Sequence, residues 1–535
     1  MTQSNISLHA ALSACCVSAA TACLEEPCWR TSWVSCFPNV KSRLPISQNP
    51  IAMNKHSNIH QKASTTKSVR QQAKSAPVSV QKKSVSKTKS KPSSQTVAAT
   101  RSPSGMAVMS SGVAIAAAQL GMQPPVVHTT VQPVNQVRSH KPRLLWIGDV
   151  LVPTGFATVT HAVLNHLHHD WEVIVSGVNY EGAPHELPYQ VIPAWQGGDM
   201  WGMNRFQHLC TEFDPTAVVI NNDWWNVAQF AKIAPAGIPV IGYMPVDGGN
   251  LDPEAMVELN KLHAAVWYTD FGHQAACSAG FTGGRHIIPH GIETEVFQPS
   301  DRLAARRLLG LKVPSNAFIV GNVNRNQPRK RLDLTIQIFA AWIKQHNVTN
   351  AHLLLHCAQK DTGWDLRRVA AYYGVADRLI LTGAEDIRDL QDAQSLRHIY
   401  NCLDMQMTTT LGEGWGLTTM EGMACGIPQI VPDSSALGEW AMPAVKVPCS
   451  RTLIHPEINT EGALVDEAPF VAALQALYQS KAARGRLAAE GLAHVRGETF
   501  RWETVARQFQ ALLPTAPRQA KRRQETQPLQ LSSRS

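Results

Sequence analysis

Short apolar runs alternate with amphipathic segments along the chain from residue 141 onward. The first run is RLLWIGD at 143–149, and after a turn at Pro153–Gly155 apolar residues recur at helical spacing as far as Leu167. Uninterrupted apolar runs of this length are typical of strands buried on both faces of a parallel sheet. Further runs follow as WEVIVSGV, TAVVIN, PVIGY, AAVWYT and RHIIP. The alternation predicts a doubly wound α/β domain over residues 141–299.

A second series of the same kind begins at AFIVGN, residues 317–322. The segment 332–345 carries apolar residues every three or four positions, as an amphipathic helix does. The strand-like runs HLLLHC, RLILTG, LDMQM, PQIVP and AVKVP follow it. We therefore expect two facing Rossmann-like domains that meet near Pro299, the second over residues 300–499. An amphipathic stretch at 500–514 predicts a terminal helix.

Basic charge is concentrated in the two end segments of the chain. Residues 1–140 carry fifteen Lys and Arg against two acids, a net of +13, and residues 515–535 carry five against one, a net of +4. Because the whole chain is +9, the remaining body has a net charge of −8. The Ser-, Lys- and Gln-rich ends bury too little apolar area to offset the entropy of ordering. We expect a disordered basic arm and a disordered basic tail.

The cysteines and the longer apolar stretches indicate a cytoplasmic protein without a transmembrane segment. The eleven cysteines form no CxxC pair and no zinc-type spacing with histidine, as expected for reduced thiols. The run Ile6–Leu24 lacks a basic start and contains polar residues, unlike a signal peptide. Gly105–Gly121 is interrupted by Ser110, Ser111 and Gln119, which makes it a poor membrane span.

The most informative motif is TTTLGEGWGLTTMEGMACGIPQIV, residues 408–431. Glu413 and Glu421 stand eight positions apart, and a glycine-rich loop precedes a helix that we expect to begin near Leu417. Such a loop permits close backbone approach, and the helix start directs free N–H groups at an anion such as a diphosphate. Glu413 would then reach sugar hydroxyls, and Glu421 would face the next polar group of the donor. The predicted donor-binding loop consists of Gly414, Trp415, Gly416 and Leu417.

Two other interpretations of this motif stay open at this point. Paired carboxylates near one sugar also fit a glycoside hydrolase, although hydrolysis needs no diphosphate cradle. A glycine-rich turn with surface acids would have no chemical role at all.

The motif resembles the E-x7-E signature of the family-4 retaining glycosyltransferases, which have the two-domain GT-B fold. Four further segments resemble this family in the expected order. WIGDVLVPTGFATVTHAVLNHL, with Gly155, resembles its first loop and helix, and IPHGIETEVFQP resembles its domain junction, with His290 in place of Asn. GNVNRNQPRKRLDLTI resembles its diphosphate-binding segment. SSALGEW, with Glu439, resembles its Gly-Gly-x-x-Glu turn, which adds Glu439 and Gly155 to the candidate donor residues.

The resemblance covers about residues 142–514 and implies a role for each carboxylate. Glu421 should hydrogen-bond the ribose of the nucleotide, and Glu413 should contact the transferred sugar. The implied substrate is a nucleotide diphospho-sugar, with no further cofactor.

Two cations of the family pattern match Arg325 and Lys330. Together with helix N–H groups, they would stabilise the charge that develops on the departing diphosphate. The resemblance therefore implies a site without a metal. Arg329 and Arg331 are alternative cations in the same run.

One departure from the family concerns the first domain. Many relatives carry a histidine there after the strand that corresponds to PVIGY, whereas this chain reads Tyr243-Met-Pro-Val-Asp247-Gly-Gly. Asp247 takes the place of that histidine, or the role is absent. The segment NNDWWN, with Asp223, ends another strand of the same domain, where it either contacts an acceptor or forms a packed aromatic corner.

Two functions from different classes remain. The first is a retaining, metal-independent transfer of a hexose-type sugar to an acceptor hydroxyl that the sequence does not identify. The second is a non-catalytic GT-B protein that docks on a polyanion through the basic arm. Nucleic acid and an anionic membrane are both candidates, and the lack of hydrophobic anchors beside the lysines favours nucleic acid. An arm that only adds solubility is a further alternative. An intact set of Arg325, Lys330, Glu413 and Glu421 favours the transferase, because a structural relic has no physical reason to keep an anion cradle.

Overall fold

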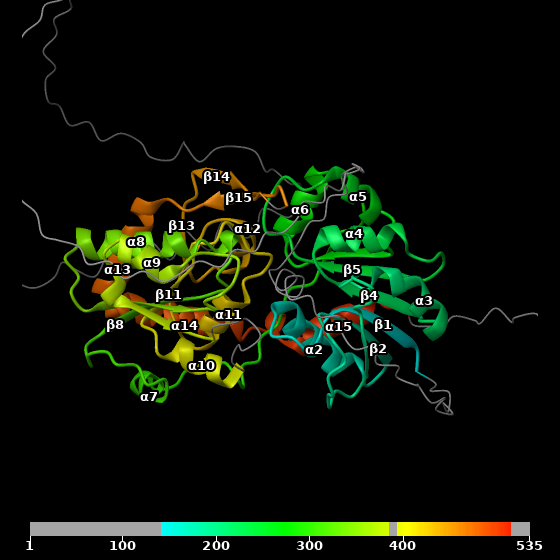
Figure 1. Ribbon diagram of the computed structural model, residues 1–535, viewed down its shortest axis with the longest axis horizontal. Coiled ribbons are helices and arrows are strands. Elements are labelled where there is room, and N and C mark those ends of the chain that lie inside the picture. The colour runs from blue at the N-terminus through cyan, green and yellow to red at the C-terminus, as the bar shows by residue number, and fades with distance from the viewer. Residues whose placement is uncertain (1–140, 385–392, 457, 515–535) are drawn as a thin grey trace, which may run out of the picture. The chain divides into compact units, whose positions relative to one another are not determined.

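A seven-stranded and a six-stranded parallel sheet form the framework of the described chain (Figure 1). The computed structural model describes residues 141–384, 393–456 and 458–514. The basic arm at 1–140 and the basic tail at 515–535 lie outside the described residues, so both stay predictions.

The first sheet has the strand order β3-β2-β1-β4-β5-β6-β7, and every pairing in it is parallel. The order reverses between β1 and β4, and ligands collect outside the carboxyl ends of strands at such a switch point. Apart from β3, the strands coincide with the predicted apolar runs. They are β1 (Arg143–Asp149), β2 (Glu172–Val178), β3 (Gln190–Pro193), β4 (Ala217–Asn221), β5 (Val240–Met244), β6 (Ala264–Trp267) and β7 (His286–Ile287).

The second sheet has the order β10-β9-β8-β11-β12-β13, again with parallel pairings and with its switch point between β8 and β11. The two sheets confirm the predicted fold class. The strands are β8 (Phe318–Val323), β9 (Ala351–His356), β10 (Leu379–Thr382), β11 (Met405–Met407), β12 (Gln429–Pro432) and β13 (Val445–Val447).

Helices connect the strands in both sheets. Before the junction they are α2 (Gly155–Leu167), α3 (Met203–Phe213), α4 (Trp224–Lys232), α5 (Pro253–Leu259) and α6 (Asp270–Ser278). After it they are α7 (Arg302–Leu308), α8 (Leu332–Gln345), α9 (Leu366–Tyr372), α10 (Ala393–Asn401), α11 (Leu417–Ala424), α12 (Ser435–Trp440), α13 (Glu467–Gln479), α14 (Lys481–Val495) and α15 (Trp502–Leu512). The helix predicted at 332–345 is α8, residue for residue.

Alternate residues of β1 face opposite sides of the first sheet. Leu144 and Trp146 belong to a core cluster with residues of α2 and α15, whereas Leu145 and Ile147 belong to a cluster with residues of α3 to α6. All four side chains are essentially buried. Burial of each one stabilises the fold by roughly 1.5–3 kcal/mol, which is why the run RLLWIGD has no polar alternation.

The terminal helix α15 packs on the first sheet, although it follows helices that cover the second. In Figure 1 it lies beside β1 and α2. The ring centroids of Phe509 and Trp146 are 5.9 Å apart, and Gln510 Nε2 donates to Asp170 Oδ2 at 3.1 Å. The amphipathic pattern predicts the helix, but it does not show that the chain returns to its first domain.

A two-stranded antiparallel hairpin stands apart from both sheets. It consists of β14 (Arg451–Ile454) and β15 (Glu461–Leu464), between β13 and α13. Its sequence, RTLI and EGAL around a polar turn, has no run long enough to predict a strand.

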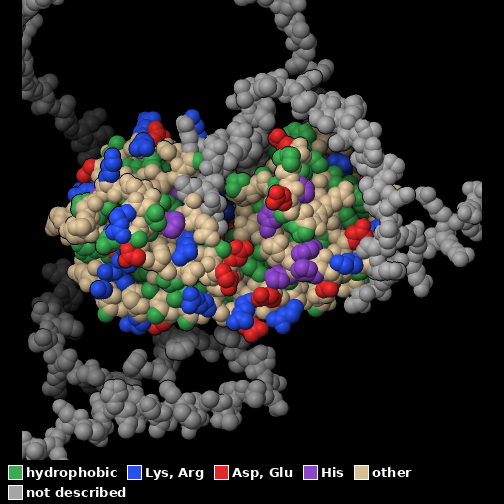
Figure 2. Space-filling model, turned by 90° about the horizontal axis from the view of Figure 1, so that it is seen from below, with side chains coloured by type: hydrophobic (Ala, Val, Ile, Leu, Met, Phe, Trp, Pro, Cys, Tyr) green, Lys and Arg blue, Asp and Glu red, His purple; other side chains and the backbone are tan. Residues whose placement is uncertain are grey.

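The surface of the described chain carries both signs of charge. Figure 2 shows acidic and basic side chains over the same face, together with a group of histidines. Among the described helices, none combines the length and the apolar character that crossing a bilayer requires.

Candidate active site

The glycine-rich loop between β11 and α11 is the centre of the candidate site. Gly416 stands directly before α11 with a φ of +94°, a left-handed conformation that favours glycine. Glycine has no side chain to cap the helix, so the N–H groups of Leu417 and Thr418 are left for another partner, while Thr419 N–H donates to Gly416 O at 3.0 Å. The helix begins at Leu417, as the sequence predicts.

Glu413 is bound on one side by two cations from the loop after β8. Lys330 Nζ lies 2.5 Å from Glu413 Oε1 and 2.6 Å from Oε2, and Arg329 Nη1 lies 3.4 Å from Oε2. On the other side, the backbone N–H of Glu413 donates to Ser435 Oγ at 3.0 Å. The carboxylate is 6% exposed, so these contacts form a buried charged cluster.

Burial and mutual attraction between opposite charges shift the pKa values of Glu413 and Lys330. Burial acts to raise the pKa of Glu413, but Lys330 and Arg329 outweigh it and hold the pKa below its ordinary value. Burial lowers the pKa of Lys330 to about 8, although Glu413 opposes that shift. Glu413 is therefore ionised at neutral pH.

Arg329 connects the two sheets at this point. Its Nε lies 3.0 Å from Asp247 Oδ2, while its Nη1 also donates to the carbonyl oxygen of Gly412. Asp247 follows β5 of the first sheet, and Arg329 lies in the 3₁₀ turn Pro328–Lys330 before α8. The alternative cation Arg329 thus reaches Glu413 and Asp247 directly.

Arg325, in contrast, pairs with a residue that the sequence analysis did not single out. Its Nε and Nη2 each lie 3.0 Å from a carboxylate oxygen of Asp361. Arg331 pairs with Asp333 in the same two-pronged way, at 2.9 Å for both contacts. The structure therefore brings Lys330 and Arg329, but not Arg325 or Arg331, into contact with Glu413.

Glu421 lies in the second turn of α11, whereas Glu413 lies in the loop before that helix. Glu421 is 8% exposed and accepts a hydrogen bond from the hydroxyl of Tyr400 at 2.5 Å. Burial raises the pKa of Glu421 to about 7, and Tyr400 opposes that rise only in part. Tyr400 lies on α10, and no spacing in the sequence connects it with Glu421.

Two predicted donor residues have protein partners in this structure. The carboxylate of Glu439, on α12, accepts the backbone N–H groups of Asp270 at 3.0 Å and Phe271 at 2.7 Å, where α6 begins. A carboxylate at that position is favoured by the helix dipole. The side chain of Trp415 is buried and stacks on Trp440 with ring centroids 5.0 Å apart, and Trp440 Nε1 donates to the Trp415 carbonyl oxygen at 2.7 Å.

The loops of the two sheets meet closely around the remaining predicted glycines. A Cβ added to Gly155 would lie 3.3 Å from Leu417 Cδ1, and one added to Gly414 would lie 2.3 Å from Pro245 Cβ. A side chain at position 155 would be in tight contact with Leu417, and position 414 has no space for any side chain. The start of α2 therefore lies against the start of α11.

Three aspartates end neighbouring strands of the first sheet: Asp149 on β1, Asp223 after β4 and Asp247 after β5. Asp149 accepts from Thr154 Oγ1 at 2.6 Å and from Asn179 Nδ2 at 3.0 Å, and burial raises its pKa. Burial, with the charge of Asp247 as the next cause, raises the pKa of Asp223 to about 7. Asp149 was not predicted as a site residue, although its place at the end of the first strand was a usable signal.

The tryptophans of the NNDWWN segment form an aromatic corner. Trp224 is 3% exposed and packs edge-on against Trp225, with centroids 5.3 Å apart at 84°. Of the two interpretations of this segment, the packed corner holds for Trp224. Asp223 is the member of the segment that lies near the other site charges.

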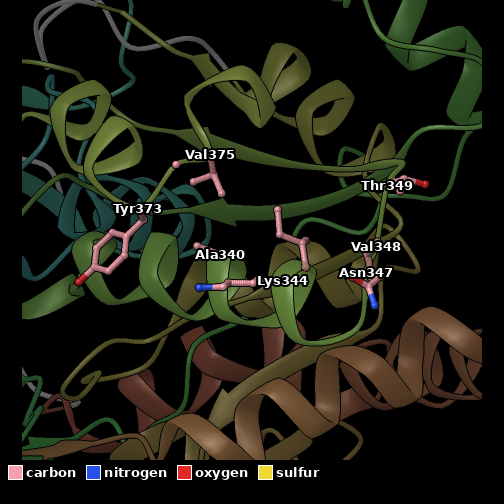
Figure 3. Close-up of a pocket in the computed structure, with 9 residues that line it drawn as sticks. Ala340, Lys344, Asn347, Val348, Thr349, Tyr373 and Val375 are labelled. Atoms are coloured by element: carbon pink, nitrogen blue, oxygen red, sulfur yellow. The ribbon is translucent and has the colours of Figure 1, made fainter.

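A separate groove of about 320 Å³ lies along the end of α8 and the segment 373–375 (Figure 3). Its lining includes Lys344 and Tyr373 but none of the predicted site residues, and it lacks a buried charge cluster. Within the described residues, no group of three or more His, Cys, Asp and Glu side chains is placed to hold a metal ion.

Solved structures define the class of fold. Sucrose-phosphate synthase from Thermosynechococcus elongatus matches with a TM-score of 0.54 and 17% identity, over 70% of this chain and 98% of that one. Anabaena HepE, solved in complex with UDP and glucose, matches with a TM-score of 0.54 and 14% identity, over 70% and 99%. This protein therefore has the two-domain GT-B fold.

The chain is similar to known glycosyltransferases in sequence as well. Residues 314–480 match the family described as "Glycosyl transferases group 1". D-inositol 3-phosphate glycosyltransferases from Stackebrandtia nassauensis and Geodermatophilus obscurus are each 29% identical over 226 residues, which is 41% of this chain. The match spans less than half of these relatives, at 46% and 44% of their lengths. The matched family segment contains Arg325, Lys330, Glu413, Glu421 and Glu439.

Proposed function

We propose that this protein is a retaining glycosyltransferase that moves a hexose-type sugar from a nucleotide diphospho-sugar to an acceptor hydroxyl. The observation that carries the proposal is the buried cluster of Lys330, Arg329 and Glu413 beside the uncapped start of α11. A buried arrangement of cations and free N–H groups is suited to the charge of a leaving diphosphate. The similarity of residues 314–480 to group 1 glycosyltransferases supports the same chemistry.

In this proposal the donor lies across α11. The N–H groups at Leu417 and the loop before it hold the diphosphate together with Lys330 and Arg325. Glu413 contacts hydroxyls of the sugar, and Glu421 contacts the ribose in place of Tyr400. Lys330 can serve both partners because its three ammonium hydrogens can bind Glu413 and a phosphate oxygen together.

The acceptor approaches from the carboxyl ends of β1, β4 and β5. The bond from the anomeric carbon to the diphosphate oxygen breaks, and its electron pair leaves with the diphosphate. The acceptor oxygen bonds to the same face of the sugar, and its proton passes to the released diphosphate. Asp247 positions Arg329 for this step through their ion pair. That Asp247 takes the place of the family histidine stays a proposal.

Donor turnover in the presence of a chelator tests this function. We expect at least one of a panel of UDP- and GDP-sugars to be consumed by the full chain, at a rate that EDTA leaves unchanged. Full loss of turnover in EDTA, restored by magnesium or manganese, would refute metal independence while keeping the transferase. Nucleotide binding without turnover of any donor, with or without acceptor, would favour the non-catalytic alternative.

A further inference from the structure

The hairpin β14–β15 has one edge that two different loops share. Glu461 exchanges two backbone hydrogen bonds with Gly249, each 2.9 Å long, and the N–H of Ala463 donates to the carbonyl oxygen of Leu411 at 2.7 Å. The N–H groups of Glu461 and Ala463 therefore point away from β14. As a result, β15 is a middle strand, with β14 on one side and the two loops on the other.

Both loops carry residues of the candidate site. Gly249 follows Asp247 by two positions, and Leu411 precedes Glu413 by two. The N–H of Leu411 in turn donates to the carbonyl oxygen of Arg329 at 2.9 Å. The edge of β15 thus connects the Asp247 loop of the first sheet with the Glu413 loop and Arg329 of the second.

Three glycines permit this close approach. A Cβ on Gly248 would lie 2.5 Å from Glu461 O, one on Gly462 would lie 2.6 Å from Leu411 Cβ, and one on Gly412 would overlap Asp247 O. None of the three has a positive φ. Glycine is required here for space and not for backbone conformation.

We propose that the β14–β15 hairpin is a positioning splint that fixes Asp247 against Arg329 and Glu413. The inference rests on the proposed function, because positioning has a consequence only where a reaction takes place. It assigns a role to a segment outside the donor and acceptor contacts. Misplacement of a reacting geometry by about 1 Å can cost on the order of 100-fold in rate, so a backbone splint between the two halves of a site has a large effect on turnover.

Gly248→Ala and Gly249→Ala are a matched pair that tests the splint. At Gly248 the methyl group meets the backbone of Glu461, whereas at Gly249 the nearest atom is the end of the Glu461 side chain at 3.9 Å. We expect Gly248→Ala to lower kcat by roughly 10- to 100-fold relative to Gly249→Ala, with an equal Kd for UDP and with a lower Tm, because the methyl group displaces the backbone of Glu461. Equal kcat values in the two variants would overturn the splint.

Glu461→Pro and Glu461→Ala are a second pair that leaves the glycines in place. Proline removes the N–H that donates to Gly249 and keeps the carbonyl oxygen, while alanine keeps both groups. Both lose the bond from Thr452 Oγ1 to the glutamate, 2.6 Å in the wild type. The splint predicts that only the proline variant loses kcat, and loss in both variants would assign the effect to the side chain.

Hydrogen exchange separates failure of the splint from failure of the proposed function. The amides of Gly249 and Glu461 should be protected in the wild type and in Gly249→Ala, and should exchange faster in Gly248→Ala. A wild-type protein that consumes no nucleotide sugar would refute the function alone. Faster exchange of both amides in Gly248→Ala, together with the kcat of Gly249→Ala, would refute the splint while leaving the proposed function in place.

Discussion

Glu413 and Glu421 have opposite electrostatic surroundings, although eight positions separate them in one segment. Glu413 is buried beside Lys330 and Arg329, which hold its pKa low. Glu421 is equally buried but has Tyr400 as its hydrogen-bond donor, and burial raises its pKa to about 7. Glu413 is charged at neutral pH, whereas Glu421 is near the midpoint of its titration. Two carboxylates of one motif therefore differ in their chemistry.

Substitution of the two glutamates should separate sugar contact from nucleotide contact. Glu413→Gln should lower turnover by about 100- to 1,000-fold, the size expected for one lost stabilising group in the transition state, and leave UDP binding almost intact. Glu421→Ala should weaken UDP binding itself. Calorimetry on the two variants measures the difference, and equal losses of UDP affinity would refute the division of roles.

The raised pKa of Glu421 should appear in the pH dependence of stability. Between the ordinary pKa of 4.5 and about 7, the folded state keeps a proton that the unfolded state has released, so stability falls as pH rises through this window. Glu421→Gln should reduce that fall by roughly 2–3 kcal/mol. Urea unfolding at pH 4.5 and pH 7.5 measures it. The same slope in both proteins would show that Glu421 does not titrate as described.

At the scale of elements, α15 is the piece that closes the core of the first domain. Phe509 is fully buried and lies between Trp146 and Tyr243, with ring centroids 5.9 and 4.8 Å away. These contacts join the end of the described chain to the first and fifth strands. Stability of the first domain therefore depends on a helix that follows the second domain in sequence.

Phe509→Ala should destabilise the protein by about 3–5 kcal/mol, because it leaves a cavity where an aromatic ring was fully packed. Gln510→Ala is the matched control on the same helix. Its side chain is exposed and makes one surface contact, so its effect should stay within about 0.5 kcal/mol. Thermal unfolding of both variants decides, and equal shifts in Tm would show that α15 is not part of this core.

The sequence predicted the elements that have a clear apolar pattern, which are strands buried on both faces and helices with one buried face. The run RLLWIGD is apolar throughout because both faces of β1 are covered, and α8 has one apolar face. The hairpin β14–β15 escaped prediction because its strands are short and carry no apolar run, and its bonds to Gly249 and Leu411 join residues that are distant in sequence.

The sequence identified the motif of the candidate site but not which of its residues form ion pairs and hydrogen bonds with each other. The sequence identified Lys330 and Glu413, and they are in contact. Its match of Arg325 to a phosphate-binding cation stays a prediction, while the ion pairs of Arg329 with Glu413 and Asp247 were not predicted. The bonds of Glu439 to α6 and of Tyr400 to Glu421 depend on tertiary packing, which spacing does not encode.

At the scale of the whole molecule, the charge is divided between an acidic body and basic ends. Residues 1–140 have a net charge of +13 and residues 141–514 a net charge of −8. This distribution is expected for a protein whose basic arm binds a polyanion. Docking through the arm stays a proposal, since residues 1–140 lie outside the described residues.

Deletion of residues 1–140 tests the arm. If the arm docks on nucleic acid, binding of the full chain to a DNA duplex should fall steeply with salt, and the deletion should abolish it. Donor turnover should survive the deletion, because every site residue follows residue 140. Binding that does not depend on salt, or that persists in the shortened chain, would show that the arm is not the docking element.

The central claim is retaining transfer at the α11 site, and the anomeric proton of the product tests it most directly. NMR spectra of the reaction between the full chain, an α-linked nucleotide sugar and an accepting alcohol should show a new α-linked anomeric signal, lost in Glu413→Gln. A β-linked product would contradict the proposed mechanism.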